Sequence, residues 1–350
     1  MNLQDITYDL PKSRIAQYPP TKRGTSRLLV LDKNSGNIED SKYSNLANIL
    51  RPSDLLVLNN TKVIPARLLV ETEDGAQREL LLLEKHGSDA SSDDHHLSKV
   101  MYRRKIQPGQ KLFLGKNEIT VESINNDGTA VIKSSSDLWD LAETSGHIPL
   151  PPYMHREDEA SDRERYQTVF AKERGSVAAP TASLNMTEEL LGEIKSKGVG
   201  IAELTLHVGL GTFMPIREAD VTKHKMHQEY FEIPPSTIQA IRKTKEQGGR
   251  VIAVGTTVTR CLEYSADLLL ADSKEKKKEQ AIACEADIFI YPGYEFKVID
   301  GLLTNFHAPD STVLMMAAAF AGWNNLLAAY EHALKQQYMF LSYGDSMLIV

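Results

Sequence analysis

The chain has 350 residues, which at roughly 150 residues per domain predicts two domains, or one core that carries a large insertion. Hydrophobic residues make up 41% of the chain and charged residues 25%, which excludes collagen-like, low-complexity and disordered proteins. The formal net charge of −7 argues against indiscriminate binding of polyanions, and two cysteines are too few for a disulfide framework. The longest apolar stretch, residues 313–323, is shorter than the roughly 20 residues that span a bilayer, so we expect a cytoplasmic protein without a membrane span.

From the N-terminus, strand-like runs at 28–31 and 55–58 precede a stretch of different composition. Residues 67–132 contain short alternating runs that are separated by turn sequences such as Asn126-Asp127-Gly128. These runs lie at 80–83, 111–114, 118–121 and 130–132. The pattern predicts a small antiparallel β-barrel, with the polar residues 86–96 as a loop.

After residue 146, strands and helices alternate again. We expect strands at 200–208, 250–254 and 287–291, and helices at 187–197, 235–246, 257–271 and 311–337, with Thr187 and Ser311 as N-caps. The alternation predicts a mixed α/β, barrel-like core formed by residues 1–66 and 147–350, interrupted by an all-β domain at 67–146. Two consecutive domains are the less favoured alternative, because the early and late strands have no separate helices.

The predicted strand at 200–208 ends in a histidine beside glycines. Its period of two places Glu203, Thr205 and His207 on one face, and Gly209 and Gly211 follow. Glycines let a ligand approach the backbone closely, and a histidine there can transfer protons near neutral pH. A hydrogen-bonded structural histidine is the alternative.

Two further positions combine a strand end with polar residues. Thr256 and Thr257 open a helix that carries Arg260, where free amides and hydroxyls can hold a carboxylate or a ribose. An ordinary N-cap with a surface ion pair between Arg260 and Glu263 is the alternative. The second position precedes the helix at 311–337 and contains Asn305 and His307, where burial can shift a pKa, although a capped turn explains it almost as well.

Other polar runs interrupt apolar strands or lack acids. Asn59, Asn60 and Thr61 form one such run and residues 342–345 another, and turn formation explains adjacent amides without a ligand. The acid-free windows 11–31 and 95–117 can contact a phosphate backbone or can be solvated faces. His224 and His227 have no third ligand at useful spacing, so we expect no metal site.

Motifs spread over nearly the whole chain carry a resemblance to a known family. They lie at 15–19, 26–29, 59–68, 146–153, 165–168, 178–182, 204–213, 226–227, 255–257, 290–293, 304–307 and 340–349. Taken together and in this order, they resemble the S-adenosylmethionine:tRNA ribosyltransferase-isomerase family of the queuosine pathway. The inserted segment matches only in its barrel-like pattern.

The resemblance implies transfer and isomerisation of the ribosyl part of S-adenosylmethionine onto 7-aminomethyl-7-deazaguanine at the tRNA wobble position. The product is epoxyqueuosine, with release of adenine and methionine. The implied partners are that tRNA and S-adenosylmethionine as co-substrate, bound by a monomer that needs no metal or redox cofactor.

The resemblance also implies roles for the residues singled out above. His207 and His307 are acid/base candidates, Arg260 is the candidate for the methionine carboxylate, and Glu229 or Asp345 can pair with the ammonium or sulfonium. Tyr18, Tyr153 and Tyr343 are candidates for stacking on a splayed base. The remaining candidate substrate-binding residues are Arg27, Asn59, Asn60, Thr61, Arg67, Thr181, Gly209, Gly211, Thr256, Thr257 and Asn305.

The chain departs from the family pattern at a few positions. Ser183, Asn185 and Met186 stand where the family has Gly, His and Phe, and Met339 replaces an arginine. An amide cannot transfer protons near neutral pH as an imidazole can. A relative that binds tRNA or S-adenosylmethionine without full turnover is therefore the main alternative. A methyltransferase is disfavoured, because no Gly-rich strand-to-helix loop is present.

Overall fold

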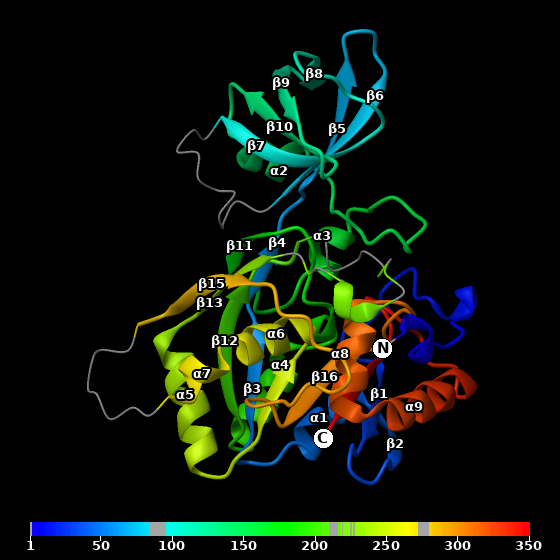
Figure 1. Cartoon of the computed structure of the whole chain (residues 1–350), viewed down its shortest axis with the longest axis vertical. Coiled ribbons are helices and arrows are strands. Elements are labelled where there is room, and N and C mark those ends of the chain that lie inside the picture. The colour runs from blue at the N-terminus through cyan, green and yellow to red at the C-terminus, as the bar shows by residue number, and fades with distance from the viewer. Residues whose placement is uncertain are drawn as a thin grey trace.

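The computed structural model describes residues 2–83, 96–209, 216, 218, 220–224, 226, 228–271 and 280–350. Its core is a nine-stranded mixed sheet (Figure 1). Across the sheet the strands are β15 (Ile282–Ala286), β13 (Glu229–Ile233), β12 (Gly200–Leu206), β3 (Leu55–Asn59), β14 (Val251–Val254), β16 (Gly301–Asn305), β17 (Ser346–Ile349), β1 (Arg27–Leu31) and β2 (Ile38–Lys42).

Helices cover both faces of this sheet. One face packs against α5 (Pro235–Glu246), α6 (Thr256–Tyr264), α7 (Ala266–Leu269), α8 (Thr312–Ala321) and α9 (Trp323–Lys335). The other face packs against α1 (Leu46–Ile49) and α4 (Glu188–Ser196). Because β3 is buried on both faces, its side chains divide between the two cores, with Val57 in one and Leu56 and Leu58 in the other. An uninterrupted apolar strand is typical of such a three-layer arrangement.

The inserted segment forms the expected closed antiparallel barrel. Its strands, in order around the barrel, are β10 (Thr129–Ser134), β7 (Leu97–Arg103), β6 (Gln77–Leu82), β5 (Arg67–Thr72), β8 (Lys111–Leu114) and β9 (Asn117–Ile124). Helix α2 (Leu138–Ser145) packs against the same core, which includes Leu138 and Ala142. The predicted loop at 86–96 lies outside the described residues except for His96.

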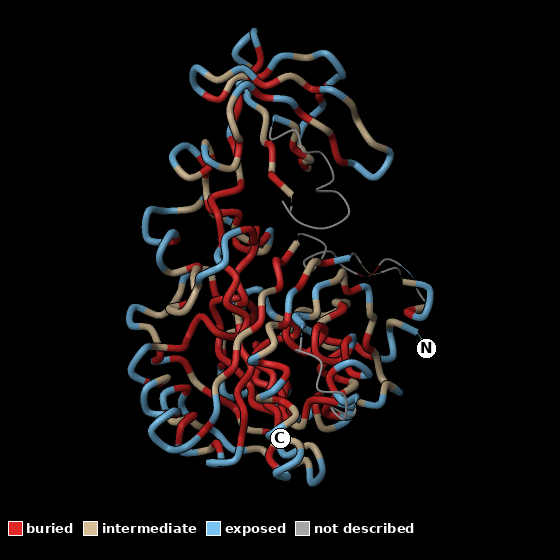
Figure 2. The backbone as a smooth tube through the Cα atoms, turned by 90° about the vertical axis from the view of Figure 1, so that its left-hand side faces the viewer, coloured by how far each residue is buried: buried red, intermediate tan, exposed pale blue. Residues whose placement is uncertain are grey.

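A short parallel ribbon, β4 (Thr61–Val63) with β11 (Glu173–Ser176), lies between the core and the barrel (Figure 1). Helix α3 (Asp162–Arg165) lies in the same region. Figure 2 shows that buried backbone continues from the core through this connection. At the base of the barrel, Arg67 and His147 form an antiparallel bridge, which brings the entry and exit of the insert together.

Three sequence-based expectations about elements are wrong in detail. No strand forms at the expected residues 287–291. The strand lies just before them, at Ile282–Ala286, because it pairs with the antiparallel β13, whose first residue Glu229 is opposite Ala286. The helix expected at 311–337 is interrupted at Gly322, whose φ of 76° is left-handed. The helix expected at 257–271 divides into α6 and α7 at Ser265. By contrast, Thr187 and Ser311 cap their helices as expected.

No single helix in the described part of the chain is long and apolar enough to cross a membrane. Helices α8 and α9 satisfy the length and composition criteria only as a pair, and they are bent by 112° relative to each other. Most residues of α8 are buried in the core, which explains its apolar composition.

Candidate active site

One edge of the core sheet gathers most of the candidate residues. The parallel strands β12, β3, β14 and β16 end there, while β13, β17 and β1 begin there. In Figure 1 this edge faces the barrel. The candidate residues at or next to the edge are Glu229, His207, Asn59, Asn60, Thr61, Thr256, Thr257, Asn305, His307, Asp345 and Arg27.

His207 follows β12 and is held from two sides. Its Nδ1 shares a 2.8 Å hydrogen bond with the Thr61 hydroxyl, and the side chain is 3% exposed. Gly175 lies against the imidazole ring, since a Cβ at this glycine would be 2.9 Å from the ring. Asn59 fixes the neighbouring backbone by donating to the Leu206 carbonyl and accepting from the Thr61 amide. The ring is therefore fixed in position by its surroundings.

A groove of about 630 Å³ opens beside His207. Asn60, Glu203 and Thr205 line it together with the imidazole. The Thr205 hydroxyl donates to the Asn60 carbonyl oxygen at 2.7 Å, and the Asn60 amide nitrogen donates to Glu203 at 3.2 Å. The predicted alternation along this strand is confirmed, because Glu203 and Thr205 are on the groove side while Leu204 is in the core.

Arg260 and Glu229 form a buried ion pair, 5% and 2% exposed. Arg260 also donates to the Ala286 carbonyl at 2.9 Å, and Glu229 accepts the Gly209 amide at 3.1 Å. The alternative of a surface pair between Arg260 and Glu263 is wrong. Glu263 instead accepts three backbone amides, from Lys297, Val298 and Ile299.

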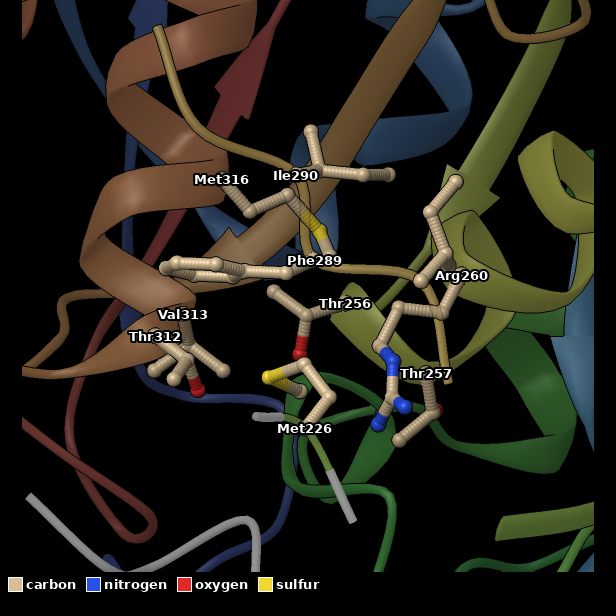
Figure 3. A pocket seen from close by; sticks show the side chains of 10 residues that line it. Met226, Thr256, Thr257, Arg260, Phe289, Ile290, Thr312, Val313 and Met316 are labelled. Carbon is tan, nitrogen blue, oxygen red and sulfur yellow. The ribbon is translucent and has the colours of Figure 1, made fainter. Parts of the chain in front are cut away.

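Arg260, Thr256 and Thr257 also line a cavity of about 10 Å³ (Figure 3). This volume is close to that of a single water site. Met226, Phe289, Ile290 and Met316 enclose the polar groups with apolar side chains. The Thr257 hydroxyl is buried and has no hydrogen-bond partner among the described residues, so it is available to a bound ligand.

His307 lies after β16 in a less polar setting. Its Nε2 shares a 2.8 Å hydrogen bond with the Thr304 hydroxyl, and its backbone amide donates to the Tyr330 hydroxyl at 2.9 Å. Tyr8 donates to its carbonyl oxygen. Burial lowers the pKa of His307 to about 3, because the charged imidazolium loses solvation there. The imidazole is therefore neutral at physiological pH.

Asp345 lies at the start of β17 and uses its carboxylate to hold backbone. It accepts the Arg27 amide at 2.7 Å and the Met339 amide at 2.8 Å, and burial raises its pKa. The Arg27 guanidinium stacks 3.6 Å above the ring of Tyr338 and donates to the Gln336 carbonyl. Asp345 and Arg27 therefore hold the backbone of residues 336–339, before β17, in position.

The remaining candidates lie in the barrel, in a turn beside the edge, or outside the described residues. Arg67 pairs with Glu79 of the barrel and with Glu157. Thr181 is closer to the edge, because it opens a short turn whose Ala182 packs beside Gly255, the residue before Thr256. Gly211 lies outside the described residues. Among the described residues, no group of three or more His, Cys, Asp or Glu side chains could hold a metal ion.

Comparison with known proteins identifies the family. The model of the queuosine biosynthesis protein family matches residues 3–349. The chain belongs to this family. The S-adenosylmethionine:tRNA ribosyltransferase-isomerases of Chlorobium phaeobacteroides and Chlorobaculum parvum are 53% and 52% identical to it, with complete coverage of both chains. A crystal structure of S-adenosylmethionine tRNA ribosyltransferase from Thermotoga maritima is 34% identical, with a TM-score of 0.55 over 99% of this chain.

Asn185, which stands where the family pattern has a histidine, is buried. Its side-chain oxygen accepts the Ser26 hydroxyl at 2.7 Å, and its amide donates to the Gly344 carbonyl at 3.4 Å. It connects the segments before β1 and β17. Ser183 and Met186 are also fully buried.

The tyrosines expected to stack on a base differ in exposure. Tyr343 is 4% exposed, donates to Asp162 at 2.8 Å and packs edge-on against Tyr166, so its ring has no free face at the surface. Tyr153 shares a hydrogen bond with Ser342. Tyr18 is 55% exposed, and the guanidinium of Arg156 lies 4.3 Å from its ring centroid.

The sequence did not predict two features of the site. The bond between Asn60 and Glu203 joins residues 143 positions apart, and local pattern gives no signal for it. The pair of Arg156 with buried Asp162, 2.7 Å apart, connects the loop before α3 to Tyr343. An arginine and an aspartate in a polar loop are too common to single out.

Proposed function

We propose that this protein is an S-adenosylmethionine:tRNA ribosyltransferase-isomerase. It transfers and isomerises the ribosyl part of S-adenosylmethionine onto 7-aminomethyl-7-deazaguanine at the tRNA wobble position, releasing adenine and methionine. The observation that carries the proposal is the gathering of histidines, a buried ion pair and polar side chains at one sheet edge, in a chain with full-length relatives of that name. The proposal includes action in the cytoplasm, as a monomer, without a metal or redox cofactor.

The ion pair of Arg260 and Glu229 matches the charges of an amino acid end group. The methionine part of S-adenosylmethionine carries a carboxylate, which would pair with Arg260, and an ammonium, which would pair with Glu229. The hydroxyls of Thr256 and Thr257 add hydrogen bonds at the start of α6. Because Met226 and Phe289 fill the space in this form, binding requires these side chains to move.

The two histidines differ in what they can do. The reaction needs a base to remove the proton beside the sulfonium and an acid to protonate the leaving adenine. With a pKa of about 3, His307 is a weak base and holds no ring proton to donate as an imidazolium at neutral pH. His207, bound to Thr61 and next to the groove, is therefore the favoured proton-transfer residue. The amine of the modified base then attacks the anomeric carbon.

The test is an incubation of purified protein with S-adenosylmethionine and tRNA that carries 7-aminomethyl-7-deazaguanine. Chromatography measures free adenine, and mass analysis identifies the nucleoside. We expect adenine and the ribosylated nucleoside in equal amounts, and His207→Asn to lower the rate at least 100-fold. RNA binding without release of adenine from folded protein would contradict the proposal.

A further inference from the structure

The groove beside His207 contains a carboxylate whose role is not explained by the ion pairs of the fold. Glu203 accepts one hydrogen bond from Asn60, and the described residues provide it no arginine or lysine partner. It lies in the middle of β12, whose neighbours on both sides are strands. A carboxylate has about four acceptor positions, so Glu203 retains capacity for a ligand.

The orientation of this carboxylate is set by a directed chain of hydrogen bonds. The Thr205 hydroxyl donates to the side-chain oxygen Oδ1 of Asn60, which leaves the side-chain nitrogen Nδ2 of Asn60 to face Glu203. The backbone of Asn60 is fixed as well, because its backbone carbonyl oxygen accepts a 2.7 Å hydrogen bond from the backbone amide of Lys172. The carboxylate is therefore positioned before a ligand arrives, which lowers the entropic cost of binding.

A fixed carboxylate in a groove suits a ligand with two neighbouring donors. The Watson–Crick edge of a guanine-type base presents an N1–H and an exocyclic amine side by side, and a carboxylate can accept both. We infer that Glu203, oriented by Asn60 and Thr205, recognises the guanine-type edge of the wobble base in the RNA substrate. This inference rests on the proposed function.

The spacing between Glu203 and His207 along the chain fits a base that contacts both residues. Glu203 and His207 are four residues apart, which in a strand corresponds to about 13 Å between their Cα atoms. A purine-sized base with a hydrogen bond of about 3 Å at each end spans a similar length. The base edge would thus contact Glu203 while its aminomethyl group points toward His207.

The rim of the groove suits the backbone of a nucleotide. Lys172 and Arg174 lie on or next to β11, are exposed and line the groove. Arg174 pairs with Glu143 of α2, so the positive charge of Lys172 is the one that can contact phosphate outside while the base lies inside. The competing ligand is the ammonium group of S-adenosylmethionine, for which the ion pair of Glu229 with Arg260 provides the matching second charge.

The experiment measures binding of two labelled anticodon stem-loop RNAs by fluorescence anisotropy. One carries guanosine at the wobble position, and the other carries inosine, which keeps N1–H and lacks the exocyclic amine. We expect the unaltered protein to prefer guanosine about tenfold, and Glu203→Gln to reduce this preference below about twofold. Affinity for S-adenosylmethionine, measured by calorimetry, should not change in Glu203→Gln.

Two further variants complete the test. Thr205→Val removes the hydroxyl that orients Asn60 without changing charge, and it should reduce the preference to about threefold even if Glu203→Gln fails to fold. Glu246→Gln loses the same charge at an exposed position of α5 and should keep the tenfold preference.

The outcomes separate the inference from the proposed function. Tight binding of both RNAs with an unchanged preference in Glu203→Gln and Thr205→Val would overturn the role of Glu203 and leave the proposed function in place. Weaker binding of S-adenosylmethionine by Glu203→Gln would assign the carboxylate to the other substrate and also overturn it. Failure of the unaltered protein to bind either RNA would overturn this inference, whereas the proposed function is decided separately by the release of adenine with tRNA that carries 7-aminomethyl-7-deazaguanine.

Discussion

At the scale of single residues, His307 links the candidate site to the pH dependence of stability. Its folded-state pKa of about 3 lies below the unfolded value of about 6.5, so the unfolded chain binds the extra proton first as the pH falls. Its contribution to stability is therefore complete above pH 6.5 and is lost progressively between about pH 6.5 and 3. His307→Gln should weaken this dependence.

The measurement is urea unfolding of both proteins at several pH values between 3.5 and 7.5. The difference between them isolates His307 from carboxyls such as Asp162. Burial raises the pKa of Asp162, but the hydrogen bonds from Arg156, the Glu159 amide and Tyr343 together lower it below its ordinary value. Parallel curves for the two proteins across this range would show that His307 is solvated in solution and would contradict its low pKa.

Asn185 has a structural role that can be measured directly. Asn185→Ala removes the acceptor of the buried Ser26 hydroxyl and leaves that group unsatisfied, so we expect a loss of about 1–3 kcal/mol in the free energy of unfolding. In a double variant with Ser26→Ala, the loss should be smaller than the sum of the single losses, because the two residues share one bond. Additive losses would show that the bond contributes nothing.

Residue-level prediction from the sequence succeeded where local pattern was sufficient. Alternation along residues 200–208 placed Glu203, Thr205 and His207 on one face, and these three residues line the groove. The function of Asp345 could not be predicted in this way. Its carboxylate holds the amide of Arg27, which is 318 positions away, and no local signal reports such a contact.

At the scale of elements, Gly322 explains why one predicted helix is two. Its left-handed φ of 76° ends α8 and begins α9, and space around it is open, since a Cβ would meet nothing within 4 Å. Gly322→Ala should therefore cost only the backbone penalty of this sparsely populated conformation, about 1–3 kcal/mol in the free energy of unfolding. Gly192, helical and also in open space, provides a control, because Gly192→Ala should stabilise by about 0.5–1 kcal/mol.

Thermal and urea unfolding of both glycine variants test this account of the bend. A stabilised Gly322→Ala would mean that α8 and α9 form a continuous helix in solution, as the apolar sequence alone predicts.

The strand expected at 287–291 shows a related effect. Strand identity there depends on pairing with β13, which is a long-range contact, so Ile282–Ala286 forms the strand although its neighbours have similar β propensity.

At the scale of the whole molecule, the class of each part was predictable and the order of the strands was not. Period-two runs identified the barrel, and alternating strands and helices identified the α/β core, because both signals are local. The sheet order places β3 beside β12 and β14, which are far from it in sequence. The shared edge that forms the candidate site follows from that order.

The two basic windows differ in what remains available to RNA. In the first window, Arg23 donates to the carbonyls of Gln167, Leu184 and Glu164, so its charge supports the fold rather than a ligand. In the second, Arg103 and Arg104 are exposed at the end of β7 on the barrel. Electrostatic contacts with tRNA are therefore expected mainly from the barrel.

The corresponding prediction concerns the salt dependence of tRNA binding. Arg103→Gln combined with Arg104→Gln should weaken binding and reduce the slope of log affinity against log salt by roughly 1.5, since each lost phosphate contact removes about 0.7–0.9. Lys195→Gln combined with Lys243→Gln removes the same charge near the opposite edge of the sheet and should leave the slope unchanged. Equal effects of the two pairs would mean that net charge alone controls binding, and an unchanged slope in the barrel variant would place the tRNA elsewhere.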